Sequence, residues 1–420
     1  KMFEKELEFK ISSAFGAGSF DEKYIRGRDY PYAYVRWTAQ KNMQAAIDLV
    51  ASKKLDFSDM KQQTYELKDA EEAYRKLYNG ELMTTLFRYS PEKPQQTMEV
   101  TKQYKKKKIN VAIIGAGQFV KGFLIPSIKK NKDLSIYAIA TKNGHDAKKL
   151  AQELGAKYAS TSYKDLINDK NVDLVVIGTR HNTHAEIANA ALKKGKNVFC
   201  EKPMAIDQEE FNTLTETINS SKSLYTCGFN RRYSPAVKSI KRELKENTPV
   251  MINYVFNNPQ LAKDHWVNDP QIGGGRIIGE ACHIIDLFNY LTGSKPIIIE
   301  AQKIASGNGQ INDENNIMTV IKYQDGSVCT LTYSCTGNTN VERERCTVIQ
   351  DGNVWEMDGF GKTKKNGNIL HKGKADEGHE EEIKQISRKL TGKDNELVTA
   401  EECINATKTT FDILNKIRRQ

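Results

Sequence analysis

The sequence has no apolar stretch long enough to cross a bilayer, and no signal peptide opens it. Its seven cysteines are scattered along the chain, and no two of them stand in a C-x-x-C spacing. This distribution does not suit a disulfide framework and indicates reduced thiols, so we expect a cytoplasmic protein. No motif has the full ligand spacing of a metal site, and we predict no metal centre.

The charge of the chain is positive but dispersed. The formal net charge is +10 over 420 residues, and the one dense basic run is Lys105–Lys108. Because this run follows a polar stretch with prolines, a solvated linker explains it better than a nucleic-acid site does. We therefore predict no nucleic-acid partner and no membrane partner. At this length and 39% hydrophobic residues, two or three domains with full cores are expected.

Residues 1–90 are predicted to form a small α+β unit. Alternation over residues 6–11 indicates a half-buried strand, and one helix is expected after Thr38. A second helix is predicted over residues 69–80, followed by a closing strand over residues 83–89. The side chains expected to face inward on the two helices are Met43, Ile47, Val50, Ala70, Ala73, Tyr74 and Leu77.

Residues 91–107 are polar and proline-bearing, which predicts a linker. From residue 108 to about 230, short apolar runs alternate with amphipathic stretches such as residues 147–154 and 184–194. This alternation predicts an α/β domain with a doubly wound, parallel Rossmann sheet. After the opening strand, the expected strands are residues 134–140, 172–178, 197–200 and 224–228.

A glycine turn follows the apolar run Ile109–Ile114. Gly115 permits a tight turn, and Gly117 lets backbone approach a pyrophosphate at the start of the next helix. The third glycine of the G-x-G-x-x-G pattern is replaced by Val120, which predicts a helix set slightly off its strand. Alone, this motif is weak evidence for a dinucleotide site.

The end of the second strand selects between NAD and NADP in such a sheet, because an acidic residue there binds the ribose 2′-hydroxyl. Here the segment is Thr141-Lys142-Asn143, without a carboxylate. Lys142 would attract a 2′-phosphate, whereas Thr141 or Asn143 would suit the hydroxyl. The expected cofactor is therefore NAD or NADP.

Residues 231–420 change in character and predict an α+β domain on a largely antiparallel, open-faced sheet. Gln324-Asp325-Gly326 supplies a hairpin turn between two of its strands. The expected strands are residues 250–256, 297–304, 317–323 and 328–333, and the expected helices are residues 279–291, 377–390 and 400–417.

Two further motifs carry chemical groups. Glu201-Lys202-Pro203 follows the apolar run 197–200, at the sheet edge where α/β folds bind ligands. The glycine-rich segment Gly273–Gly279 leads to His283 and Asp286, which lie three apart and share a helical face. A neutral histidine is a natural proton acceptor near pH 7.

With these motifs together, the chain from Lys108 to Gln420 resembles the glucose–fructose oxidoreductase/inositol dehydrogenase (Gfo/Idh/MocA) family. The resemblance rests on the glycine loop, Glu201-Lys202-Pro203, Gly228–Arg232 and the segment before His283. It implies hydride transfer between a nicotinamide cofactor and a sugar, sugar-nucleotide or cyclitol hydroxyl. It also allows a homo-oligomer through the C-terminal sheet.

The same resemblance implies roles for individual residues. Lys202 and His283 would form the catalytic pair. Residues implied in cofactor binding are Gly115, Ala116, Gly117, Gln118, Phe119, Thr141, Lys142, Thr179, Arg180, His184, Glu201 and Lys202. Residues implied in substrate binding are Lys202, Asn230, Arg231, Arg232, Glu280 and His283.

Two departures from the family pattern touch this site. The family often has Asp four residues before the histidine, where this chain has Gly279. It also tends to have Thr-Pro-Asn where this chain has Thr179-Arg180-His181. A dinucleotide-binding sensor or scaffold without turnover is therefore an alternative. A zinc enzyme using His181 and His184 is a weaker one.

Residues 1–90 resemble the C-terminal end of a medium-chain alcohol dehydrogenase. The matching segments are Lys5–Lys10, Tyr34–Thr38 and Leu67–Tyr74. The resemblance implies a catalytically silent remnant, or the tail of a truncated partner domain. Fused ahead of a Gfo/Idh/MocA-like domain, it resembles bidomain oxidoreductases associated with bacterial cell-surface polysaccharide synthesis.

Overall fold

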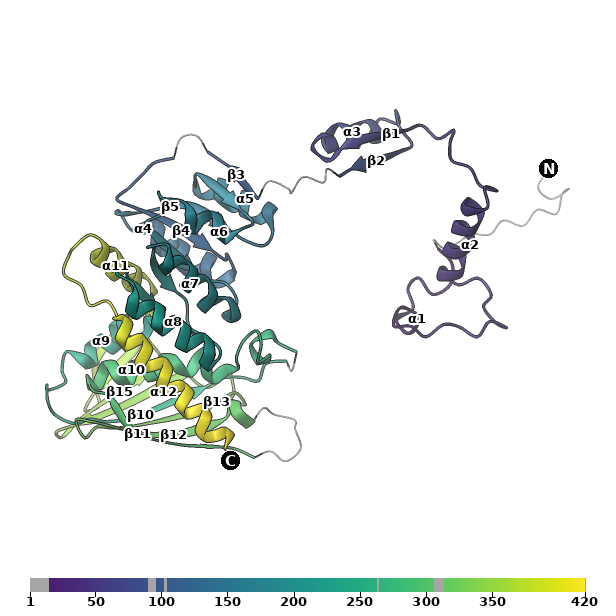
Figure 1. The fold of residues 1–420 in the computed structure, drawn as a ribbon. Helices are drawn as coiled ribbons and strands as arrows, with labels where there is room; N and C mark the ends of the chain where they lie inside the picture. The colour runs from purple at the N-terminus through teal and green to yellow at the C-terminus, as the bar shows by residue number, and fades with distance from the viewer. Residues whose placement is uncertain (1–14, 90–95, 102–103, 263, 306–312, 420) are drawn as a thin grey trace. The chain divides into compact units, whose positions relative to one another are not determined.

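A computed structural model describes residues 15–89, 96–101, 104–262, 264–305 and 313–419, so the strand predicted over residues 6–11 lies outside the described residues. The chain forms two compact units, residues 1–94 and 95–420 (Figure 1). None of the described helices is both long and apolar enough to pass through a bilayer.

The first unit contains the predicted helices and closing strand. Helix α2 spans Ala39–Ala51 and α3 spans Ala70–Tyr78, after the short helix α1 at Glu22–Ile25. Strands β1 (Gln62–Glu66) and β2 (Thr84–Arg88) pair in parallel on either side of α3 in the sequence. The apolar stripe of α2 is not buried as predicted: Met43 and Ile47 are 50% and 61% exposed. Val50, the third residue of the stripe, is 43% exposed, so none of the three side chains enters a core in the described part of this unit.

The second unit begins with a seven-stranded sheet in the order β3-β6-β5-β4-β7-β8-β9. All neighbouring pairs are parallel except the edge pair β3–β6. This confirms the predicted Rossmann sheet, and the strand order reverses between β4 and β7. The strands are β3 (Thr97–Glu99), β4 (Ile109–Ile114), β5 (Leu134–Ala140), β6 (Tyr158–Ser160), β7 (Leu174–Ile177), β8 (Asn197–Cys200) and β9 (Tyr225–Cys227).

Both faces of this sheet are covered. Along β4, Val111 and Ile113 belong to one buried cluster, while Ala112 and Ile114 belong to another. Successive strand residues point to opposite faces and both faces are covered, so every residue of β4 is buried and the run is apolar except for Asn110. The helices of this domain are α4 (Ile125–Lys130), α5 (Gly144–Leu154), α6 (Tyr163–Asn168), α7 (His184–Lys193) and α8 (Gln208–Ser220).

The predicted linker over residues 91–107 is too long. Residues Thr97–Glu99 form β3 and pair with β6. The hydroxyl of Tyr104 donates to the Ser135 hydroxyl at 2.6 Å, and the ring of Tyr104 packs against that of Tyr137. The chain therefore joins the second unit before residue 97. The sequence did not show this, because an edge strand can be as polar as a linker.

The C-terminal part of this unit is built on an eight-stranded sheet in the order β11-β12-β13-β10-β14-β15-β16-β17. Only β10 and β13 pair in parallel among its neighbours. Its strands are β10 (Met251–Asn257), β11 (Pro296–Lys303), β12 (Ile317–Tyr323), β13 (Val328–Ser334), β14 (Glu344–Gln350), β15 (Asn353–Asp358), β16 (Lys362–Lys365) and β17 (Asn368–Lys372). The last four strands are not predicted from the sequence pattern.

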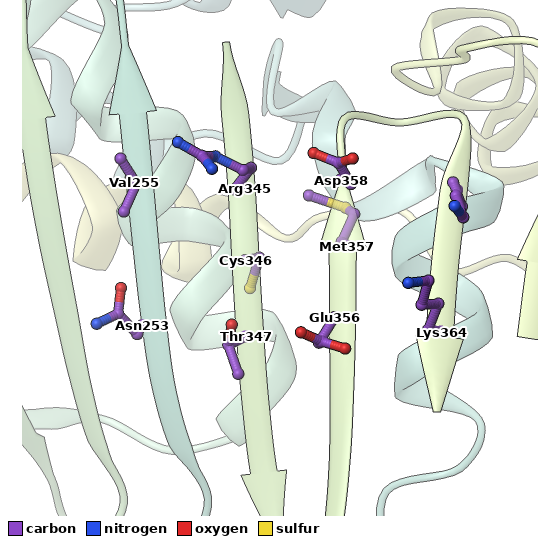
Figure 2. Close-up of a pocket in the computed structure, with 10 residues that line it drawn as sticks. Asn253, Val255, Arg345, Cys346, Thr347, Glu356, Met357, Asp358 and Lys364 are labelled. Atoms are coloured by element: carbon purple, nitrogen blue, oxygen red, sulfur yellow. The ribbon is translucent and has the colours of Figure 1, made fainter. Parts of the chain in front are cut away.

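Helices cover one face of this sheet and leave the other open (Figure 1). The covering helices include α9 (Pro235–Lys241), α10 (Cys282–Thr292) and α12 (Ala400–Arg418), while α11 (His379–Leu390) packs against α4. Alternate residues of β12 are buried and exposed, as expected for a one-sided sheet. The open face has a hollow of about 480 Å³, lined by Asn253, Arg345, Glu356 and Lys364 among others. Figure 2 draws the side chains that line it.

Candidate active site

The glycine turn after β4 lies at the point where the strand order reverses. Gly115 has φ +85, and a side chain there would place a Cβ atom 2.6 Å from the Gly178 carbonyl oxygen. Gly117 has no atom within 4 Å of its Cβ position, which leaves the room that an anion needs beside the following helix N-terminus. The turn thus fits a dinucleotide pyrophosphate, and Ala116, Gln118 and Phe119 belong to it.

Val120 replaces the third glycine of the motif without breaking the packing. Its Cγ2 atom lies 2.3 Å from where a Cβ of Gly178 would stand. A glycine on β7's end therefore provides the volume that the valine needs. Gly178, nearly 60 positions later in the chain, thus takes the place of the third glycine, and the loop can carry Val120.

The segment after β5 is ordered by its own hydrogen bonds. Thr141 donates from its hydroxyl to the Asn143 carbonyl at 2.6 Å. The side chain of Asn143 caps α5 by accepting from the backbone N–H of His145 at 3.0 Å. Lys142 is exposed beside them, so its ammonium is the charged group of this segment available to a ligand.

Lys202 and His283 come from the two domains of the second unit. Lys202 follows β8 and donates from Nζ to the Gly279 carbonyl oxygen at 2.8 Å. His283 lies on α10, is 5% exposed, and its buried Nδ1 has no hydrogen-bond partner among the described residues. Burial, with the charges of Arg231 and Lys202, holds the pKa of His283 well below 6.5. The imidazole is therefore neutral, which is the form that accepts a proton.

The residues after β7 bond mostly to backbone. His184 is 1% exposed, and its ring nitrogens face the carbonyls of Pro203 at 2.8 Å and Thr179 at 3.2 Å. It therefore ties two loops together, in place of the cofactor contact that the resemblance implies. Arg180 is exposed and lies over the ring of Trp266.

The zinc alternative finds no support in this geometry. Nδ1 of His181 faces the Gly273 carbonyl at 2.8 Å, and His184 faces two other carbonyls. In the described parts of the chain, three or more His, Cys, Asp or Glu side chains nowhere gather in a way that could hold a metal ion.

Arg231 and Arg232 are buried in ion pairs. The guanidinium of Arg231 binds Glu344 with two bonds of 2.8 and 2.7 Å, and that of Arg232 binds Asp286. Both arginines are 5% exposed or less. We therefore assign them a structural role in place of the substrate contact that the resemblance implies. A buried guanidinium needs such a partner, because its desolvation is costly.

Two other implied site residues, Glu280 and Asn230, are hydrogen-bonded within the protein, and a third, Glu201, is buried. Glu280 accepts hydrogen bonds from Tyr333 and Asn258, each at 2.6 Å. Asn230 donates to the Glu377 carbonyl at 2.9 Å. Glu201 is buried, and burial raises its pKa to about 7.

His379 is a residue that the sequence analysis missed. It opens α11, and its ring lies 4.8 Å from that of Phe123 and 5.4 Å from that of Phe119. Burial is the main cause that lowers the pKa of His379 to about 4, and the charges of Arg231 and Lys202 act in the same direction. Nothing in the sequence around residue 379 signals this place. Only the packing of α11 against the glycine-loop helix brings it there.

Comparison with known proteins supports this architecture. Residues 109–229 match the model of the oxidoreductase family with an NAD-binding Rossmann fold, and residues 244–351 match the GFO/IDH/MocA C-terminal domain. The two matches follow the same order as the domains described above.

Curated relatives of known activity match over part of their length. A myo-inositol 2-dehydrogenase from Thermotoga maritima is 23% identical over 226 residues, covering 52% of this chain and 66% of the relative. A levoglucosan dehydrogenase from Pseudarthrobacter phenanthrenivorans is 26% identical, covering 45% of this chain and 56% of the relative. The matched segment thus spans two thirds or less of these two proteins.

Solved structures match the second unit more fully. A levoglucosan dehydrogenase in complex with NADH and levoglucosan superposes with a TM-score of 0.63 and 19% identity, covering 74% of this chain and 97% of that one. At this identity the match establishes the fold. Residues 109–229 and 244–351 therefore carry the NAD-binding domain and the C-terminal domain of Gfo/Idh/MocA oxidoreductases.

Proposed function

We propose that the protein transfers hydride between NAD or NADP and a hydroxyl-bearing carbon of a sugar, sugar nucleotide or cyclitol. The observation that carries this proposal is the hydrogen bond of 2.8 Å from Lys202 to the Gly279 carbonyl, four residues before His283 on the segment that continues into α10. The charge of Lys202 is among the causes that lower the pKa of His283, so the two groups share one environment. The named activities of the relatives, on inositol and levoglucosan, support this substrate class.

The cofactor would be held by the glycine turn. The backbone of Gly115–Phe119 surrounds the open space at Gly117, and Lys142 stands at the end of β5 for the ribose. When bound, the nicotinamide supplies or accepts the hydride.

The two side chains would do different work on the substrate. Neutral His283 would take the hydroxyl proton in the oxidation direction and return it in the reduction direction. Lys202 uses one N–H on the Gly279 carbonyl, which leaves two N–H groups to hydrogen-bond the reacting oxygen and stabilise its developing charge.

Two substitutions test these roles. Lys202→Met keeps most of the side-chain volume and removes the ammonium, while His283→Asn removes the base. A positioned acid–base group typically contributes on the order of 10² to 10⁴ in rate, so each variant is expected to lose turnover heavily and to bind dinucleotide normally. Lys408→Met on α12 and His371→Asn on β17 are matched controls. Substrates would be found by screening sugars, sugar nucleotides and cyclitols for the absorbance of reduced nicotinamide.

Equal turnover of the parent and both variants would refute the assigned roles. Tight dinucleotide binding with no turnover on the whole panel would instead favour the sensor or scaffold alternative.

We also propose that the open face of the C-terminal sheet joins copies of this chain. Met251, Met318 and Val320 are 62%, 63% and 48% exposed on that face. The hollow beside them carries Arg345 and Glu356, and mixed charges of this kind suit a self-complementary two-fold interface (Figure 2). Val320→Glu is expected to yield monomers in light-scattering chromatography, whereas an unchanged mass would exclude this face.

We also propose that residues 1–90 are the remnant of a medium-chain dehydrogenase domain. We propose that the protein as a whole acts in surface polysaccharide synthesis. Two features support an incomplete domain. A two-stranded parallel sheet is rarely found uncovered. In addition, only four described residues of this unit are buried: Thr38, Ala39, Tyr65 and Ala73.

A further inference from the structure

Gly279 lies beside two residues of the Rossmann domain, Lys202 and His181. Its carbonyl accepts the Lys202 ammonium at 2.8 Å. A Cβ atom added to it would lie 2.9 Å from Cε1 of His181 and 3.5 Å from Nδ1. The φ of Gly279 is not in the left-handed region, so any residue fits the backbone there. The imidazole of His181 therefore occupies the space that a side chain at position 279 would need.

His181 is fixed in this place. Its Nδ1 lies 2.8 Å from the Gly273 carbonyl oxygen, and a carbonyl only accepts, so Nδ1 carries the hydrogen and Nε2 the lone pair. The ring is 8% exposed and meets the ring of Trp266 edge-on at 4.8 Å. Burial, followed by the charge of Lys202, lowers the pKa of His181 to about 3, so the ring is neutral.

The loop that carries His181 grips the glycine-rich segment at a second point. The backbone N–H of Asn182 donates to the Ile272 carbonyl at 3.1 Å. Two neighbouring residues of one domain thus bond two neighbouring carbonyls of the other. Both hydrogen bonds lie at Ile272 and Gly273, and Gly279 is six residues further along the chain. The His181 ring also lies beside Gly279, so this loop adjoins both ends of the segment.

We propose that His181 is a positioning residue, which holds the Gly273–Gly279 segment so that the Gly279 carbonyl fixes the Lys202 ammonium for reaction. The inference rests on the proposed function, because it assigns Lys202 to the reacting oxygen. A neutral ring suits this task, since it fills the space beside Gly279 without placing a second charge next to the ammonium.

A four-protein cycle tests the proposal. His181→Asn retains a donor near the Nδ1 position and vacates the space beside Gly279, while Gly279→Ala pushes a methyl group onto the ring. A misplacement of about 1 Å can cost about 100-fold in rate, so each single variant is expected to lower kcat by about 10- to 100-fold at unchanged NAD affinity. In the double variant the methyl group enters the vacated space, and kcat is expected to recover above either single variant.

Gly373→Ala is the matched control, because its Cβ would meet nothing closer than the His371 ring at 3.7 Å. It is expected to keep the kcat of the parent. A His181→Asn variant within twofold of the parent kcat would overturn the proposal, as would a double variant no faster than the slower single one.

A second measurement needs no substrate. Acetic anhydride labelling, quantified by mass spectrometry against the exposed Lys408, reports how firmly the Lys202 ammonium is held. Labelling of Lys202 is expected to rise at least severalfold in each single variant and to fall again in the double variant. If this pattern appears but no substrate is turned over, the positioning role stands and the proposed function fails. If the parent turns over a sugar but labelling is equal in all four proteins, the positioning role fails.

Discussion

The buried ion pair between Arg231 and Glu344 yields the most quantitative prediction. Two guanidinium N–H groups of Arg231 reach the carboxylate at 2.8 and 2.7 Å, and the Tyr254 hydroxyl donates to it at 2.6 Å. The side chains of Arg231 and Glu344 are 6% and 1% exposed. Glu344→Gln keeps the shape but turns one acceptor into an N–H group that faces donors. It also removes the nearer of the two carboxylates that face the buried Arg231 charge, and leaves Glu377 at 3.9 Å as the other.

The expected cost follows from two arguments. Breaking a buried pair by removing one charge costs about 3–5 kcal/mol. Burial alone would raise the pKa of Glu344, but the charge and hydrogen bonds of Arg231 lower it from 4.5 to about 2, which corresponds to about 3 kcal/mol. We therefore expect Glu344→Gln to reduce the free energy of unfolding by about 3 kcal/mol or more at pH 7.

Urea unfolding followed by tryptophan fluorescence measures this change, since Trp355 is buried on the strand next to that of Glu344. The control is Glu300→Gln, which breaks the exposed pair with Lys416 and should cost less than about 1 kcal/mol. Because the folded-state pKa is depressed, the stabilisation is complete above about pH 4.5 and is lost as the pH falls toward 2. The reasoning is refuted if both variants lose the same small amount at pH 7, or if the difference persists unchanged at the lowest pH.

Four further outcomes are expected. Gly117→Val should abolish NAD binding in calorimetry without lowering the melting temperature, because its side chain enters open space that the pyrophosphate needs; unchanged affinity would remove the glycine turn from the site. A protein without residues 1–94 should bind NAD as the full chain does, since the two units are separately compact, and weaker binding by a folded truncation would contradict this. In a Glu201→Gln variant, which removes the carboxyl whose pKa is about 7, kcat/KM should stay level from pH 8 to 5.5 because the lowered pKa keeps His283 neutral, whereas an unshifted histidine would lose about tenfold. Lys142→Ala should weaken NADP binding more than NAD binding, and equal losses would show that this lysine does not face the ribose.

Local sequence was sufficient for the elements that are buried on a regular pattern. The predicted strand over residues 134–140 matches β5, and residues 317–323 match β12, whose alternation the structure reproduces. Their apolar spacing reflects the face or faces that they bury, so the pattern is visible without any partner. In contrast, β16 reads Lys-Thr-Lys-Lys, and such a polar run resembles a loop. The edge strand β17 has only the apolar pair Ile369 and Leu370, which is too short to show a period.

The charged residues of the site show the limit of local reasoning. Gly228–Arg232 suggested a substrate contact, yet the fate of each arginine depends on a carboxylate far away in the chain: Glu344 is 113 residues from Arg231, and Asp286 is 54 residues from Arg232. No short-range pattern encodes such a pairing. Tertiary packing brings the partners together, and the high cost of an unpaired buried charge then fixes them.

The sequence by itself determined the Rossmann sheet, its glycine turn and the presence of Lys202 and His283 at element ends, because strand periodicity and turn chemistry are local properties. Only the tertiary structure decided which of the polar residues are buried in ion pairs and which are exposed. It placed the His181 ring in the space beside Gly279, and it placed Gly178 where Val120 needs room. In both cases the vacant volume and the side chain that fills it lie far apart in the chain, and close packing requires that they match.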